Sequence, residues 1–96
     1  MRRSDVLQII AENKSELKKY SVRTLAIFGS AARDEIKQES DIDVLVEFES
    51  APGFDQYIDL KFFLEDLLGR SVDLVTLDAL KPRVRPEIEK DILYVA

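Results

Sequence analysis

Residues 22–48 read VRTLAIFGSAARDEIKQESDIDVLVEF, and this stretch decides the fold. Its two ends, residues 22–28 and 41–48, consist mostly of apolar and β-branched residues, which is typical of strands buried in a sheet. The Gly29-Ser30 pair ends the first strand, and the residues that follow favour a short helix over 31–36 and then a polar loop. The stretch therefore predicts two strands joined by a connection of about a dozen residues.

Hydrophobic spacing outside this stretch predicts further helices and a third strand. Because a long helix separates the second and third strands, they can form a right-handed parallel crossover. The expected fold class is α/β (α+β), a small mixed sheet with helices packed on it, in one domain spanning residues 1–96. The further elements are a helix over 4–19 with Ser4 as N-cap, a helix from 54 or 55 to 68 followed by Gly69, a strand over 72–77, a turn of helix near 79–81 capped by Asp78, and a helix over 86–92 with Pro86 at its first position.

The composition excludes most familiar catalytic chemistries. The chain has 96 residues, a formal net charge of -5, no His and no Cys. It therefore has no catalytic triad based on His, no thiolate zinc site and no disulfide. Carboxylates, hydroxyl groups, Lys and Arg remain, and carboxylates favour hard cations such as magnesium.

Charge and hydropathy also restrict the expected partners and location. No apolar run approaches the roughly 20 residues that a membrane span needs, and the N-terminal residues become polar too early for a signal peptide. We therefore expect no membrane contact and a location in the cytoplasm. The net acidity argues against direct contact with nucleic acid.

Three carboxylates and a serine turn are predicted to meet at one end of the sheet. Asp41 and Asp43 lie two residues apart on a strand, so their side chains point to the same face, about 6.5–7 Å apart. If the second strand is antiparallel to the first and parallel to the third, Ser30 and Asp73 join them at that end. A Gly-Ser turn that opens a helix offers N–H groups to a phosphate, and carboxylates beside it can hold one or two divalent cations. This combination suits nucleotide chemistry.

Each of these residues also has a plainer interpretation. The three carboxylates can be solvated charges at strand edges, and the Gly29-Ser30 pair can be an ordinary turn from a strand into a helix. Arg33, on or just behind the short helix, either reaches a bound triphosphate or belongs to a solvated face. An EF-hand is excluded, because Leu45 occupies the fifth position of the loop and no glycine follows at the sixth.

The spacing of the turn and the carboxylates matches a known signature. Gly29-Ser30, ten residues and then Asp41-Ile42-Asp43 form the GS-x10-DxD pattern of the polymerase-beta-like nucleotidyltransferase superfamily. FGSAARDE followed by SDIDVLVEF resembles its smallest branch, the minimal nucleotidyltransferase (MNT) domains, and VDLVTLDALKPRVRPEI is similar to the family's third strand and C-terminal end. The resemblance implies that magnesium is bound by the carboxylates of Asp41, Asp43 and Asp73. It also implies that Gly29, Ser30 and their turn hold a nucleoside triphosphate. Many relatives have Gly where this chain has Asp34.

The resemblance implies a partner as well. Members of this branch are commonly encoded beside small helical HEPN proteins, and characterised relatives transfer AMP from ATP to a tyrosine of the HEPN ribonuclease and so silence it. We therefore expect an antitoxin that uses Mg²⁺, as two ions, and ATP to AMPylate a cognate HEPN toxin. Larger relatives carry an extra helical domain that this chain lacks, so a partner protein is expected to supply the acceptor.

Two alternatives keep the same fold. One is a non-catalytic antitoxin that masks its toxin by binding alone. The other is an enzyme that modifies a small molecule, such as an antibiotic, with the help of a separate helical subunit. A homo-oligomer or hetero-oligomer is compatible with all three hypotheses.

Overall fold

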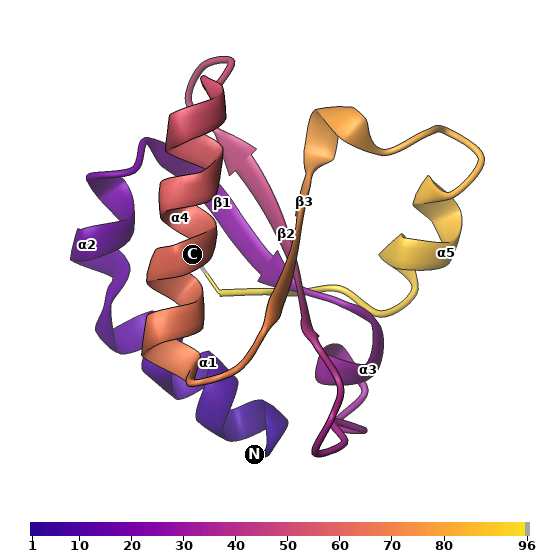
Figure 1. Ribbon diagram of the computed structural model, residues 1–96. Coiled ribbons are helices and arrows are strands. Elements are labelled where there is room, and N and C mark those ends of the chain that lie inside the picture. The colour runs from indigo at the N-terminus through magenta and orange to yellow at the C-terminus, as the bar shows by residue number, and fades with distance from the viewer. Residues whose placement is uncertain (96) are drawn as a thin grey trace.

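Helices and strands alternate along the computed structural model, which describes residues 1–95 (Figure 1). The expected fold class is confirmed, because the strands form a small mixed sheet on which helices pack. The elements are α1 (Arg3–Glu12), α2 (Lys14–Lys18), β1 (Val22–Ile27), α3 (Gly29–Ala32), β2 (Ile42–Phe48), α4 (Phe54–Leu68), β3 (Val72–Thr76), the 3₁₀ helix η1 (Leu77–Ala79), α5 (Arg85–Glu89) and β4 (Leu93–Tyr94).

Within residues 1–95, the sheet has the strand order β3-β2-β1-β4. Strands β1 and β2 are antiparallel, with Ile27 opposite Val44. Strands β2 and β3 are parallel, with Asp43 opposite Asp73. Both directions agree with the prediction from the sequence, and they bring the end of β1 and the starts of β2 and β3 to the same end of the sheet.

The main hydrophobic core fixes the position of β2. Figure 1 shows α1, α2 and α4 gathered on one side of the strands, with α5 on the other side. Burying one Val, Ile or Leu side chain stabilises the fold by about 1.5–3 kcal/mol, so a one-residue slip of β2 would be costly. The centre of the core consists of fully buried side chains from β2 and α4: Ile42, Val44, Val46, Leu60 and Leu64.

The prediction of one helix over residues 4–19 is wrong, because the chain breaks at Asn13 into α1 and α2. The Nδ2 atom of Asn13 donates a hydrogen bond to the carbonyl oxygen of Ile9 at 2.7 Å. The backbone of Asn13 is not helical, with φ −117° and ψ 22°. A side chain that bonds to the backbone in this way competes with the hydrogen bonds of the helix.

The start of α1 is capped by carboxylates, so the expected N-cap at Ser4 is also wrong. The helix begins at Arg3. Asp5 accepts a hydrogen bond from the N–H group of Arg2 at 2.9 Å, and Asp34 accepts one from the N–H group of Arg3 at 2.7 Å. Because Asp34 follows α3, the second contact ties the N-terminal helix to the Gly-Ser turn.

Two left-handed residues end helices. Gly69 directly follows α4 with φ 66°, as predicted from the sequence. Asp34 has φ 60° and follows the end of α3, so α3 covers Gly29–Ala32 rather than residues 31–36. The Gly-Ser pair is therefore inside this short helix and not in front of it.

The C-terminal segment contains a short strand that the sequence pattern did not reveal. Strand β4 pairs with the end of β1, with Ile27 opposite Leu93, and the helix expected over 86–92 ends earlier, at Glu89. Pro86 occupies the second position of that helix rather than the first. The helical turn expected near 79–81 lies at Leu77–Ala79, so Asp78 is inside it and does not cap it. None of the helices in the described part of the chain has both the length and the apolar character for a membrane span.

Candidate active site

The turn after β1 places the backbone directly against Asp43. The N–H group of Phe28 donates to the carbonyl oxygen of Asp43 at 3.1 Å, and the next residue, Gly29, has φ +61°. A Cβ atom at Gly29 would lie 2.5 Å from Oδ2 of Asp43. Only glycine adopts this φ without strain and leaves room for the carboxylate. The turn and the Asp43 side chain are therefore fitted to each other.

Asp43 is the central member of a group of three carboxylates. It is half-buried and stands opposite Asp73, on a neighbouring strand about 4.8 Å away. Asp41 lies two residues before it and, like Asp73, is exposed. Burial raises the pKa of Asp43 above its ordinary value, repulsion from Asp73 and Asp41 raises this pKa further, and Arg33 lowers it. Asp41 and Asp73 are thus close enough to Asp43 to repel its carboxylate.

The chemistry of this group fits a hard divalent cation. Carboxylate oxygens are the ligands that magnesium prefers, and a cation would relieve the repulsion around Asp43. In the side-chain conformations found over residues 1–95, no three acidic residues are arranged to hold a metal ion together. Asp43 and Asp73 are nevertheless paired in register. We therefore treat Asp41, Asp43 and Asp73 as candidate ligands.

Ser30 directly follows Gly29 in the turn. The carbonyl oxygen of Ser30 accepts a hydrogen bond from the N–H group of Glu35 at 2.8 Å, and that of Gly29 accepts one from Arg33 at 3.1 Å. These bonds close the turn around a half-buried serine side chain. Ser30 and Gly29 are thus held at the same end of the sheet as the carboxylates.

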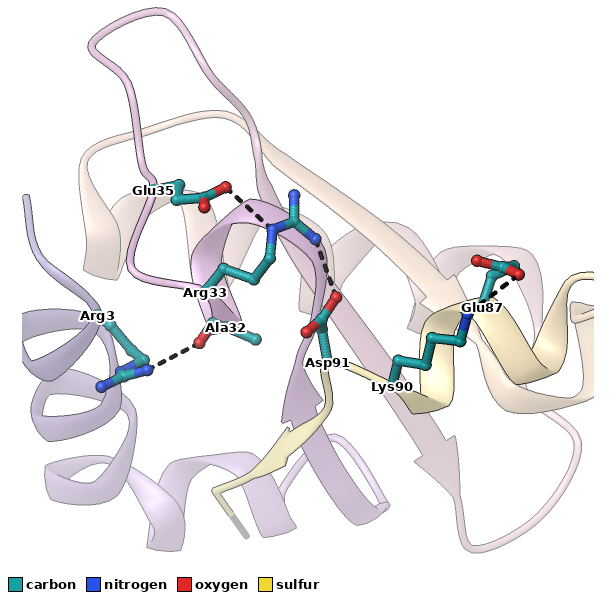
Figure 2. Close-up of polar contacts among 7 residues, drawn as sticks. All are labelled: Arg3, Ala32, Arg33, Glu35, Glu87, Lys90 and Asp91. Atoms are coloured by element: carbon teal, nitrogen blue, oxygen red, sulfur yellow. Dashed lines mark hydrogen bonds and ion pairs between the residues drawn. The ribbon is translucent and has the colours of Figure 1, made fainter.

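Arg33 is close to the carboxylate group, but other residues hold its guanidinium group. Its Nε atom lies 3.0 Å from Glu35, and its Nη1 atom lies 3.1 Å from Asp91 (Figure 2). The hydrogen bonds that Arg33 donates to Glu35 and, with a smaller effect, to Asp91 raise the pKa of Arg33. Sequence reasoning singled out Arg33 but neither of its partners, because the contact with Asp91 spans 58 positions.

The left-handed residue Asp34 explains a departure seen in the sequence. The family resemblance of the sequence implies Gly at this position in many relatives, and φ 60° is a conformation that Gly adopts without strain. The Asp34 carboxylate accepts a hydrogen bond from the backbone N–H group of Arg3. The Arg3 guanidinium group donates a hydrogen bond to the carbonyl oxygen of Ala32 at 3.0 Å (Figure 2). The N-terminus of α1 therefore supports the turn, and sequence reasoning missed the contribution of Arg3.

An open, polar cleft of about 390 Å³ adjoins Asp41. Arg70 lines the cleft and donates hydrogen bonds to backbone carbonyl groups of the loop that precedes Asp41. Sequence reasoning did not identify Arg70, because a pattern of side chains gives no sign of a contact with backbone oxygens. The remaining lining residues are Gln38, Glu39, Ser40, Gly69 and Ser71.

The sheet topology and the carboxylates beside a Gly-Ser turn define a nucleotidyltransferase, and comparison with known proteins agrees. Residues 7–95 match the family described as Nucleotidyltransferase domain. The chain therefore belongs to the nucleotidyltransferase family and is an enzyme of that class.

Relatives place the chain more narrowly. It is 46% identical over 94 residues to a provisionally named protein adenylyltransferase of Methanocaldococcus jannaschii, with 96% of both chains covered. It is 38% identical over 92 residues to the protein adenylyltransferase MntA of Thermococcus cleftensis, with 95% of this chain and 93% of the relative covered. The chain is thus a homologue of MntA.

Solved structures agree with this placement. A structure described as a minimal nucleotidyltransferase is 31% identical, with a TM-score of 0.84, and the match covers 97% of this chain and 95% of that one. The fold is also similar to a chain from the complex of a tri-AMPylated Shewanella oneidensis HEPN toxin with an MNT antitoxin. That match has a TM-score of 0.68 and 18% identity, and covers 94% of this chain and 71% of the other. The resemblance to the MNT branch inferred from the sequence is confirmed.

Proposed function

We propose that this protein transfers AMP from ATP to a hydroxyl group of another protein in a magnesium-dependent reaction. The observation that carries the proposal is the pairing of Asp43 with Asp73 directly beside the Gly29 turn. This arrangement occurs in a chain that is homologous to a protein adenylyltransferase. The turn that we propose to bind phosphate thus lies at the same end of the sheet as the carboxylates, as nucleotidyl transfer requires.

The carboxylates would have two tasks. Asp41 and Asp43 would hold magnesium, with Asp73 as the third ligand; the bound cation would neutralise the charge of the triphosphate and of the leaving pyrophosphate. Asp73 is exposed, and it would accept the proton of the acceptor hydroxyl as that oxygen bonds to the α-phosphorus. A carboxylate is the natural base here, because the chain has no His.

The turn would hold the rest of the nucleotide. Backbone N–H groups around Gly29 and the hydroxyl group of Ser30 would bind the β- and γ-phosphates. Arg33 would exchange part of its contact with Glu35 and Asp91 for the triphosphate. This exchange is electrostatically feasible because both of its ion pairs are exposed to solvent and therefore weak.

We propose further that the acceptor is a tyrosine of a cognate HEPN toxin and that the protein acts in the cytoplasm as its antitoxin. Support comes from the homology to MntA and from the similar fold of an MNT antitoxin solved with an AMPylated HEPN toxin. Asp41 and Asp73 are exposed, so a hydroxyl group carried by another protein can reach them.

A growth assay tests the antitoxin proposal. The proposed cognate HEPN toxin would be expressed alone, with the wild-type chain, and with the double variant Asp41→Asn, Asp43→Asn. We expect growth to be restored by the wild type and by the matched control Asp55→Asn, which changes an acidic residue at the start of α4, but not by the double variant. Restoration by the double variant would instead indicate neutralisation by binding alone, and AMP transfer only to a small molecule would contradict the protein acceptor.

A further inference from the structure

The side chain of Arg70 donates its hydrogen bonds to backbone carbonyl oxygens rather than to carboxylates. Arg70 lies between the end of α4 and the start of β3 and is half-buried. Its Nη2 atom donates to the carbonyl oxygens of Gln38 and Ser40, each at 3.0 Å, and also to that of Lys37. A single nitrogen of the guanidinium group thus holds three of the four carbonyl groups of the 37–40 loop.

This arrangement costs folding free energy, which is unexpected for a side chain that only stabilises the fold. The Nε atom of Arg70 is buried and has no hydrogen-bond partner within the described residues. Among residues 1–95, no carboxylate lies within ion-pair distance of Arg70. A buried donor without a partner destabilises the folded state. The gain from Arg70 must therefore come from what it holds in place.

The loop held by Arg70 leads directly into the candidate metal ligands. Ser40 precedes Asp41, and the N–H group of Ile42 donates to the carbonyl oxygen of Ser71 at 2.9 Å. The N–H group of Val72 donates to Glu65 at 2.9 Å. The segment around Arg70 therefore joins the starts of β2 and β3, which carry the three carboxylates.

We propose that Arg70 is a positioning residue for magnesium binding. It fixes the 37–40 loop against the start of β3 and so holds Asp41 at the end of the sheet where Asp43 and Asp73 are paired. Arg70 acts through the loop, because its Nη2 atom donates to the backbone carbonyl groups that precede Asp41. The inference rests on the proposed role of Asp41 as a metal ligand.

Electrostatics and positioning predict opposite effects when Arg70 is removed. Taking a positive charge away from a group of carboxylates should strengthen the binding of a divalent cation if charge alone matters. If Arg70 positions Asp41, its removal should weaken magnesium binding by about 10–100-fold, as is typical when groups that support a metal ligand are lost. The sign of the change therefore separates the two explanations.

The experiment measures Mg²⁺ affinity by calorimetry without nucleotide, and hydrogen exchange of the amides of residues 37–42. The variants are Arg70→Met and Arg70→Lys. The matched control is Arg23→Met, which changes an exposed arginine at the opposite end of β1 whose side chain contacts Glu49. We expect weaker Mg²⁺ binding and faster exchange for Arg70→Met, intermediate values for Arg70→Lys, and wild-type values for Arg23→Met.

Each outcome has a defined meaning. Unchanged or tighter Mg²⁺ binding by a folded Arg70→Met variant would overturn the positioning role. If Arg70→Met does not fold, Arg70→Lys decides, and unchanged affinity together with unchanged exchange in residues 37–42 would then overturn it. The failure of the proposed function looks different, because Asp41→Asn and Asp43→Asn would then leave Mg²⁺ affinity unchanged in the wild-type background.

Discussion

Replacing Gly29 by Ala tests whether the turn and Asp43 form one unit. The left-handed φ of +61° costs an alanine roughly 1–2 kcal/mol. The added Cβ must also displace Oδ2 of Asp43 from a distance of 2.5 Å, and an overpacking change of this kind costs about 1–3 kcal/mol more. We therefore expect the free energy of unfolding to fall by about 2–5 kcal/mol, which lowers Tm by at least ~8 °C in a domain of this size.

The other two glycines separate these contributions. Gly69 has φ +66°, but no atom lies within 4 Å of a Cβ added there, so Gly69→Ala pays only for the backbone conformation. Gly53 has φ −74° and equally open surroundings, so Gly53→Ala should leave Tm almost unchanged. We therefore expect Tm to be highest for Gly53→Ala, lower for Gly69→Ala and lowest for Gly29→Ala.

Two measurements test whether the Gly29 turn and Asp43 form one unit: thermal unfolding, monitored by circular dichroism, and Mg²⁺ binding, measured by calorimetry. Only Gly29→Ala should lose Mg²⁺ affinity, because only this variant displaces the Asp43 carboxylate. Adding Asp43→Ala to Gly29→Ala removes the colliding oxygen, so the double variant should be more stable than the sum of the two single changes predicts. Equal Tm and equal Mg²⁺ affinity for Gly29→Ala and Gly69→Ala would refute this reasoning.

Three further predictions follow from contacts around the site. The pKa of Asp43 is raised in the folded chain, so the ionised carboxylate destabilises the fold above that pKa, and this destabilisation disappears at low pH. Without metal, Asp43→Asn should therefore raise Tm at neutral pH and lose this advantage toward pH ~4. A higher Tm of Asp43→Asn that persists in acid would argue against repulsion. At Asp34, Gly relieves the φ of 60° but loses the contact with Arg3, whereas Ala loses that contact and keeps the left-handed strain that Asp already carries. Chemical denaturation should show Asp34→Gly within about 1 kcal/mol of the wild type and Asp34→Ala about 1–2 kcal/mol less stable than Asp34→Gly. Equal values for the two variants would be inconsistent with the left-handed strain. Finally, Asp91→Asn partly releases Arg33 and should lower the KM for ATP. Arg33→Gln should raise this KM at least about tenfold, as expected for a lost charge-assisted hydrogen bond. If steady-state kinetics give the same KM for both variants, a contact between Arg33 and the triphosphate is excluded.

The strands and the long helix could be predicted because their signals are local. Alternating residues such as Ile42 and Val44 define β2, and the helical repeat of Leu60 and Leu64 defines α4. The parallel pairing of β2 and β3 was expected from the long helix that connects them, whereas the antiparallel pairing of β1 and β2 was only assumed. Elements that depend on one polar contact were missed, since the bond from Asn13 to Ile9 ends α1 within a stretch that a partial apolar stripe predicted to be one helix.

The site was predictable in its carboxylates but not in its supports. Asp41, Asp43 and Asp73 follow from strand spacing and topology, and the Gly29-Ser30 turn follows from its position directly after a buried strand. The contacts of Arg3, Arg70 and Asp91 link segments that are far apart in the sequence, and two of these three residues bind backbone oxygens. Side-chain patterns do not show such contacts, so only the structure reveals them.

The central claim is that the carboxylates beside the Gly29 turn direct the transfer of AMP to a partner protein. The most direct measurement incubates the chain, Mg²⁺ and the proposed cognate HEPN toxin with ATP labelled either at the α-phosphate or at the γ-phosphate. The account predicts that the partner acquires the α label on tyrosine, that pyrophosphate is released, and that both signals disappear in the double variant Asp41→Asn, Asp43→Asn. Transfer of the γ label, or undiminished labelling by the double variant, would contradict it.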